Sequence, residues 1–89
     1  MLNVVFKGRF KKDLKKLKSS NRDEDELIAV ITVLANEEPL DEKFRDHNLI
    51  GNYAGCRECH IRPDWRLIYQ MAETDLLLMR TGSHRELFD

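Results

Sequence analysis

The stretch Arg57-Glu58-Cys59-His60-Ile61-Arg62-Pro63-Asp64-Trp65-Arg66 decides how this chain folds. It alternates like the end of one β-strand, turns at Pro63-Asp64 and alternates again at the start of the next strand. The alternation predicts a buried face with Cys59 and Ile61, and a polar outer face with Glu58, His60 and Arg62. A hairpin folds without such polar residues, so they form either a solvated face or a functional surface.

The N-terminal part predicts one strand followed by two helices. The expected elements are a strand over residues 1–7, a helix over residues 9–18 and a helix over residues 23–38. The second helix has a clear start signal, because Asp23 can cap it and Glu26 follows three residues later, as in a capping box. Pro39 ends it. We expect the two helices to pack as an antiparallel pair on a sheet.

The C-terminal part predicts a loop and then antiparallel sheet. The loop covers residues 41–55, strands cover residues 56–62, 66–71 and 76–81, and a short helical turn covers residues 83–88. The last strand is apolar on both faces, which predicts a central position. The fold class is therefore α+β, with an N-terminal strand and a two-helix hairpin packed on a small antiparallel sheet. Residues 1–89 are expected to form a single domain.

Charge is distributed unevenly along the chain, although the net charge is −1. Residues 1–22 carry eight basic residues and one acid, whereas residues 23–46 carry nine acids and two bases. A cationic segment of this kind can hold phosphates.

No apolar run approaches the ~20 residues that cross a bilayer, and no signal peptide is evident. We therefore expect a cytoplasmic protein with no membrane partner.

The two cysteines form a lone C-x-x-C, Cys56 and Cys59. Residues three apart on a strand point to opposite faces, so these two cannot bridge each other or share a metal. A zinc site would need a second pair of ligands, and the chain has no second cysteine pair. We expect two unpaired thiols, with Cys59 in the core, and no metal site.

Three histidines are placed where a sheet can bring them together. His47 lies on the loop, His60 near a strand end and His84 just beyond the last strand. Histidine is the usual proton-transfer residue near neutral pH, and two of them can divide the roles of base and acid. With Asp64 beside them and Arg80 to stabilise negative charge, the set suits metal-independent RNA cleavage by the 2′-hydroxyl.

Four fragments carry a family resemblance. They are Asp46-His47-x-Leu49-x-Gly51, the run from Cys56 to Trp65, Leu67-Ile68-Tyr69, and Arg80-Thr81-Gly82-Ser83-His84-x-x-Leu87-Phe88. In this order and spacing they resemble the YafQ branch of the RelE/ParE toxin superfamily, over essentially the whole chain. The resemblance implies a type II toxin that cleaves mRNA in the ribosomal A site and is neutralised by a cognate antitoxin, without a cofactor.

The resemblance also implies roles for individual residues. The catalytic set is His47, His60, Asp64 and His84, with His84 as the general acid on the leaving 5′-oxygen. The residues it implies in substrate binding are Arg80 on the phosphate, and Trp65 and Phe88 lining the site. The charge of the basic helix adds Lys11 and Lys15, which we expect to contact ribosomal RNA or acidic parts of the antitoxin.

Two alternatives remain open at this stage. One is a ParE-like toxin of the same fold that acts on DNA gyrase and needs no cluster of three histidines around an arginine. The other is a non-catalytic module that binds RNA or a partner through the basic helix alone.

Overall fold

The computed structural model describes residues 1–89, which form one five-stranded sheet in the order β1-β5-β4-β3-β2. The elements are β1 (Asn3–Phe6), α1 (Gly8–Leu17), α2 (Glu24–Ala35), η1 (Glu42–Phe44), β2 (His47–Asn48), η2 (Gly51–Tyr53), β3 (Arg57–Arg62), β4 (Trp65–Met71), β5 (Asp75–Gly82) and α3 (His84–Phe88). Only the β1–β5 pair is parallel. The predicted α+β fold is confirmed, and the apolar β5 lies between two strands as predicted.

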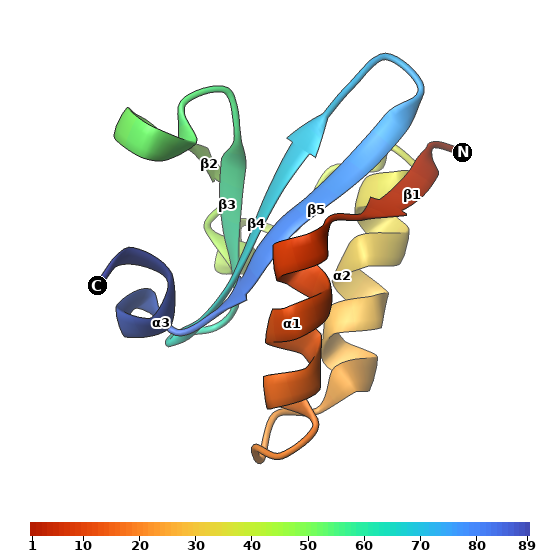
Figure 1. The fold of residues 1–89 in the computed structure, drawn as a ribbon. Coiled ribbons are helices and arrows are strands. Elements are labelled where there is room, and N and C mark those ends of the chain that lie inside the picture. Colours follow the sequence, from red (N-terminus) through yellow and green to blue (C-terminus); the bar gives the residue numbers. More distant parts are fainter.

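The sheet has helices on both of its faces (Figure 1). Helices α1 and α2 cover one face, and the main core lies beneath them with Phe10, Leu27 and Leu67 fully buried. On the opposite side lie α3 and the segment that carries η2 (Figure 1). A small second cluster of Cys56, Ile68 and Leu87 holds this side together. The sheet therefore keeps one face for stability and leaves the other only partly covered.

The β3–β4 hairpin follows the predicted alternation with one exception. Cys59 and Ile61 are buried in the main core as predicted, whereas Glu58 is also buried, with only 3% of its surface exposed. Glu58 lies on the polar face as predicted. It is buried there because β2 pairs along β3 and places His47 directly opposite it. Cys56 lies in the second cluster, on the other face from Cys59, as the spacing predicts.

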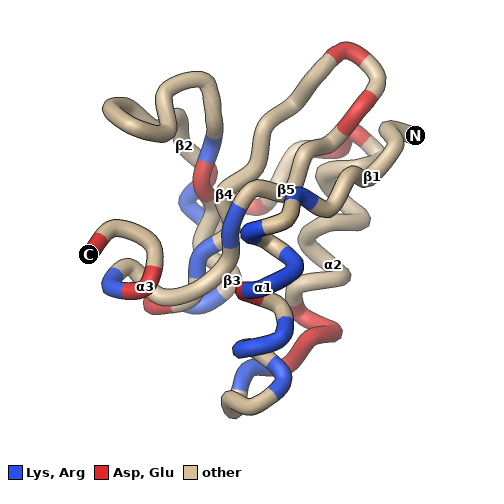
Figure 2. The backbone as a smooth tube through the Cα atoms, viewed as in Figure 1, with Lys and Arg blue, Asp and Glu red and all other residues tan.

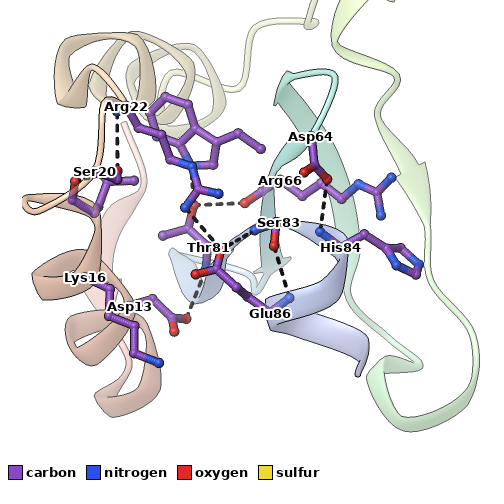
Figure 3. A network of polar contacts seen from close by, with 12 residues as sticks. Asp13, Lys16, Ser20, Arg22, Asp64, Arg66, Thr81, Ser83, His84 and Glu86 are labelled. Atoms are coloured by element: carbon purple, nitrogen blue, oxygen red, sulfur yellow. Dashed lines mark hydrogen bonds and ion pairs between the residues drawn. The ribbon is translucent and has the colours of Figure 1, made fainter.

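The N-terminal cap of α2 differs in one respect from the capping box that the sequence predicts. Asp23 caps the helix by accepting a hydrogen bond from the Asp25 backbone N–H at 2.9 Å, but Glu26 does not complete the capping box. Instead the Glu26 carboxylate accepts two hydrogen bonds from the Arg62 guanidinium, at 3.0 and 2.5 Å. The capping box does form at α3, between Ser83 and Glu86 (Figure 3). Glu26 thus ties α2 to the end of β3.

A buried carboxylate joins α1 to the edge of β5. Strand β1 ends opposite Leu78, so the following β5 backbone has no strand partner on that side. Asp13 of α1 takes this place, since its Oδ2 accepts the Thr81 backbone N–H at 3.1 Å (Figure 3). The same carboxylate receives the Arg80 guanidinium at 2.6 and 3.1 Å, and both side chains are about 9% exposed.

No helix in this structure combines the length and the apolar character needed to cross a bilayer.

Replacing Asp13 with alanine should destabilise the fold strongly. The change leaves the Arg80 guanidinium buried without its counter-charge, a loss worth about 3–5 kcal/mol of unfolding free energy. Urea unfolding at pH 7 measures it, with Glu73→Ala as the exposed-acid control, which should stay within about 0.5 kcal/mol of wild type. A loss below about 1 kcal/mol for Asp13→Ala would show that the ion pair does not hold α1 on the sheet.

Candidate functional site

Strand register gathers the polar side chains on the less covered face of the sheet. His47, Glu58, Ile68 and Arg80 are successive cross-strand partners from β2 to β5. The next row contains His60, Arg66 and Gly82. Neighbouring strands lie about 4.8 Å apart, so each row is a short line of adjacent side chains. Residues 35 positions apart in sequence, such as His47 and Gly82, thus come to one small surface.

The position of His47 is fixed by its neighbours in the chain. Asp46 accepts hydrogen bonds from Tyr69 Oη at 2.5 Å and from the Arg57 guanidinium at 3.2 and 3.3 Å. The His47 ring contacts the Arg45 carbonyl oxygen through Nδ1 at 2.6 Å. A carbonyl can only accept, so Nδ1 carries the proton and Nε2 is left with its lone pair toward the site.

Glu58 is the centre of the site. Its Oε1 lies 3.2 Å from His60 Nε2, 3.6 Å from His47 Nε2 and 3.6 Å from Arg66 Nε. The two histidine rings are 6.0 Å apart, centre to centre. Glu58 Oε2 and Arg66 Nε are both buried without a hydrogen-bond partner. Unpaired buried polar atoms cost free energy, and they occur at sites that await a ligand.

His60 is held in an environment that favours its neutral form. Burial, and then the positive charge of Arg66, lower its pKa below the ordinary histidine value, while Glu58 acts in the opposite direction. Near pH 7 the ring is therefore uncharged, and it can exchange a proton with a bound group.

His84 belongs to the same face but not to the histidine pair. It is the first residue of α3, and its backbone N–H lies 3.4 Å from Asp64 Oδ1 (Figure 3). Its ring packs on Phe88, with 4.9 Å between ring centres, and Phe88 packs in turn on Tyr53. The structure thus brings His47 and His60 together, and links His84 to the hairpin turn through Asp64. Asp64 meets the backbone of His84 and not a histidine ring.

Two predicted substrate-binding residues have structural partners instead. Trp65 is 2% exposed in the main core, and its Nε1–H donates to Thr81 Oγ1 at 2.9 Å. The indole is therefore held in the core, and the lining of the site by Trp65 stays a prediction. Arg80 is neutralised by Asp13, and its Nη1 reaches Tyr53 Oη at 3.4 Å. The phosphate contact of Arg80 stays a prediction.

The remaining predicted binding residues are accessible. Phe88 is 40% exposed at the end of α3. Lys11 and Lys15 are exposed on α1, where Lys and Arg make up half of the helix (Figure 2). A groove of about 760 Å³ opens beside His60 between α2, η1 and the hairpin, and its cationic lining residues are Lys43, Arg45, Arg62 and Arg66. The face therefore combines a titratable centre with cationic surroundings.

Comparison with known proteins places the chain in a family. The family model described as the bacterial toxin of type II toxin–antitoxin systems, YafQ, matches residues 2–89. The chain belongs to the YafQ toxin family. The mRNA interferase toxin YafQ of Escherichia coli K12 is 36% identical over 87 residues, which cover 97% of this chain and 95% of that protein.

Solved structures agree with this family assignment. YafQ in the E. coli DinJ–YafQ complex superposes with a TM-score of 0.91 at 34% identity, over all of both chains. A metal-bound toxin from Helicobacter pylori superposes with a TM-score of 0.92 at 44% identity, over 99% of this chain and all of that chain. The YafQ branch and the enzyme class predicted from the sequence, an mRNA interferase, are thus confirmed. The ParE-like and non-catalytic alternatives lose their support.

Sequence reasoning missed two residues of this candidate site, Glu58 and Arg66. Both were visible in the hairpin sequence, but a charged residue on a strand is most often solvated. Strand pairing identifies both residues. Strand β2 pairs with β3 beside Glu58, and β4 places Arg66 directly opposite His60. A two-residue strand inside an expected loop gives no periodicity from which to predict that cover.

His60 should titrate below an ordinary histidine. Because its folded-state pKa is lowered, the ring stays neutral as the pH falls through about 6.5 and gains its proton only at lower pH. An NMR titration of the three histidine Cε1–H signals, assigned with His60→Gln, measures the midpoint. A midpoint for His60 at or above 6.5 would show that Glu58 outweighs burial and Arg66.

Proposed function

We propose that this toxin cleaves mRNA in the ribosomal A site by acid–base catalysis that needs no metal ion. The observation that carries the proposal is the register, which aligns the Glu58–histidine centre, Arg66 and the start of α3 on one face. The bond from the 2′-oxygen to phosphorus would form as the bond from phosphorus to the 5′-oxygen breaks. The products are then a 2′,3′-cyclic phosphate and a free 5′-hydroxyl.

The proton transfers divide between the two ends of the face. Glu58 with His60 and His47 would take the proton of the 2′-hydroxyl, because a buried carboxylate and a neutral imidazole both accept protons at pH 7. His84 would donate a proton to the leaving 5′-oxygen. Asp64 would act by holding the start of α3, and so His84, against the hairpin turn.

Arg66 takes the phosphate role that the sequence predicted for Arg80. It stands between His60 and Gly82 in its row, which is between the proposed base and acid, where the reacting phosphate must sit. Its Nε has no hydrogen-bond partner, whereas the guanidinium of Arg80 already binds Asp13 in two places. A preorganised donor at the developing charge is the type of contact that lowers the barrier most.

Surface charge supports a large anionic target. Lys11 and Lys15 are exposed on α1 and would contact ribosomal RNA. The DinJ–YafQ complex of the E. coli relative supports the proposal that a cognate antitoxin neutralises this toxin as well. Acidic segments of such an antitoxin would fit the cationic helix.

Replacing His84 with glutamine should abolish cleavage while leaving ribosome binding intact. Loss of a general acid lowers the rate roughly 10²–10⁴-fold, and an exposed helix position tolerates glutamine. Primer extension on translated mRNA measures cleavage, and co-sedimentation with programmed ribosomes measures binding. Full cleavage by His84→Gln would remove it from the mechanism, and loss of both activities would assign it to binding.

Replacing Phe88 with alanine should weaken substrate binding more than turnover. An aromatic ring stacked on an unpaired base contributes about 1–3 kcal/mol, so KM for programmed ribosomes should rise about 5- to 100-fold while kcat changes little. Phe6→Ala is the matched control, since Phe6 is similarly exposed but lies on β1 at the other edge of the sheet. Equal effects of the two variants would contradict base stacking at Phe88.

A further inference from the structure

A separate cavity lies on the less covered face of the sheet, next to α3. It has a volume of about 400 Å³ and is bordered by the start of α1, by the segment that carries η2 and by α3 (Figure 1). Its lining residues are Arg9, Ile50, Asn52, Tyr53, Leu87 and Phe88. Cavities that hold small ligands typically measure about 300–1,000 Å³. The space is therefore large enough for one nucleoside.

We propose that this cavity binds the base of the leaving nucleotide, which is the nucleotide immediately downstream of the cut, and that Asn52 selects that base. The inference rests on the proposed function, because the role of His84 sets the direction of the RNA across the face. It extends that function by assigning a site and a residue to the choice of where the mRNA is cut.

The position of His84 decides which nucleotide reaches the cavity. His84 would protonate the leaving 5′-oxygen, and only a ribose separates that oxygen from the base of the same nucleotide. The His84 ring packs on Phe88, which lines the cavity, with 4.9 Å between ring centres. The nucleotide that carries the 2′-hydroxyl lies at the other end of the row, beside His60. The leaving nucleotide is therefore the one that enters.

Two aromatic rings form walls for a base. Tyr53 and Phe88 stand at 85° to each other with 5.8 Å between ring centres, so a base can stack on one ring and contact the edge of the other. Ile50 beside them is 90% exposed. Exposed apolar groups next to a lysine-rich helix suit an occupant with apolar faces and a negatively charged backbone, and an unpaired nucleotide has both.

The Tyr53 wall is held in place before any ligand binds. The Tyr53 carbonyl accepts the Cys56 backbone N–H at 2.9 Å, and the Tyr53 hydroxyl accepts a hydrogen bond from Arg80 Nη1 at 3.4 Å. Arg80 is itself fixed by two hydrogen bonds to Asp13. Gly51 begins η2 with a φ of 72°, a conformation that glycine adopts without strain. A preformed wall avoids the cost of ordering a loop on binding.

Asn52 and Arg9 supply polar groups at the same cavity. Both residues line it and both are exposed. A side-chain amide offers a donor and an acceptor side by side, which is the arrangement that distinguishes bases by their polar edges. Arg9 lies in the first turn of α1, where its guanidinium can bind the phosphate that follows the leaving nucleotide. Asn52 would thus select the base, and Arg9 would hold the strand.

The test maps cleavage of translated mRNAs that differ only in the base immediately downstream of the cut. Asn52→Leu should lower the ratio between the most and the least cleaved base about fivefold or more, because it removes both polar groups of the amide. The preference at every other codon position should stay as in wild type. Asn21→Leu is the matched control, since Asn21 is an exposed asparagine in the connection between α1 and α2.

Asn52→Asp separates a changed contact from a damaged fold. A carboxylate keeps the shape of the side chain but only accepts hydrogen bonds, so the preference should move toward bases with an amino group on their polar edge. Unchanged base preference in both Asn52 variants would overturn the site. A change at a different nucleotide would overturn the assignment to the leaving nucleotide. Weaker neutralisation by the antitoxin with unchanged base preference would give the cavity to that partner, and would also overturn the proposal.

Binding of an uncleavable RNA separates this inference from the proposed function. A 2′-O-methyl tetranucleotide has no free 2′-hydroxyl to attack the phosphate, and NMR follows its titration into the isotope-labelled wild-type toxin. We expect the amide signals of Asn52 and Tyr53 to shift by amounts that depend on the base in one position of the oligonucleotide. A toxin that shows these shifts but never cuts translated mRNA contradicts the proposed function and not the site. Oligonucleotides that leave both signals unmoved would overturn the site.

Discussion

The ion pair between Asp13 and Arg80 is the constraint on which the rest of this structure depends. Asp13 is the only acid among the first 22 residues, and it is buried in the contact between a lysine-rich helix and a strand that carries an arginine. Without it, α1 would bring positive charge against Arg80 and leave the edge of β5 without a partner for Thr81 N–H. Because β5 runs directly into α3, the same contact also fixes where His84 begins.

Arg80 and Arg66 show how the geometry of an ion pair separates structure from function. Arg80 binds Asp13 at 2.6 and 3.1 Å, in the bidentate arrangement that gives a guanidinium its strongest pairing. Arg66 stands 3.6 Å from Glu58, and its Nε remains unsatisfied. Both arginines lie on the same sheet face, and Arg66 Nε is the buried arginine donor that has no hydrogen-bond partner. A sequence motif shows that an arginine is present, whereas the partners of that arginine in the fold decide its role.

The sequence predicted most of the fold because each element carries its own signal. The two helices, the β3–β4 hairpin and the Ser83 capping box follow from periodicity and turn chemistry. Long-range partners are what no local pattern encodes. The hydrogen bond from the Trp65 indole N–H to Thr81 inside the core is one example. The burial of Glu58 is another, because β2 is two residues long and cannot be recognised from its sequence.

The two unsatisfied atoms at the centre of the site distinguish between its possible ligands. Glu58 Oε2 needs a donor and Arg66 Nε needs an acceptor, and both are buried together. A ribose hydroxyl beside a phosphate offers a donor and an acceptor at once, so RNA can satisfy both atoms. An unpaired buried group costs about 1–3 kcal/mol. A ligand that satisfies both atoms should therefore bind more tightly than one that satisfies only the carboxylate or only the guanidinium.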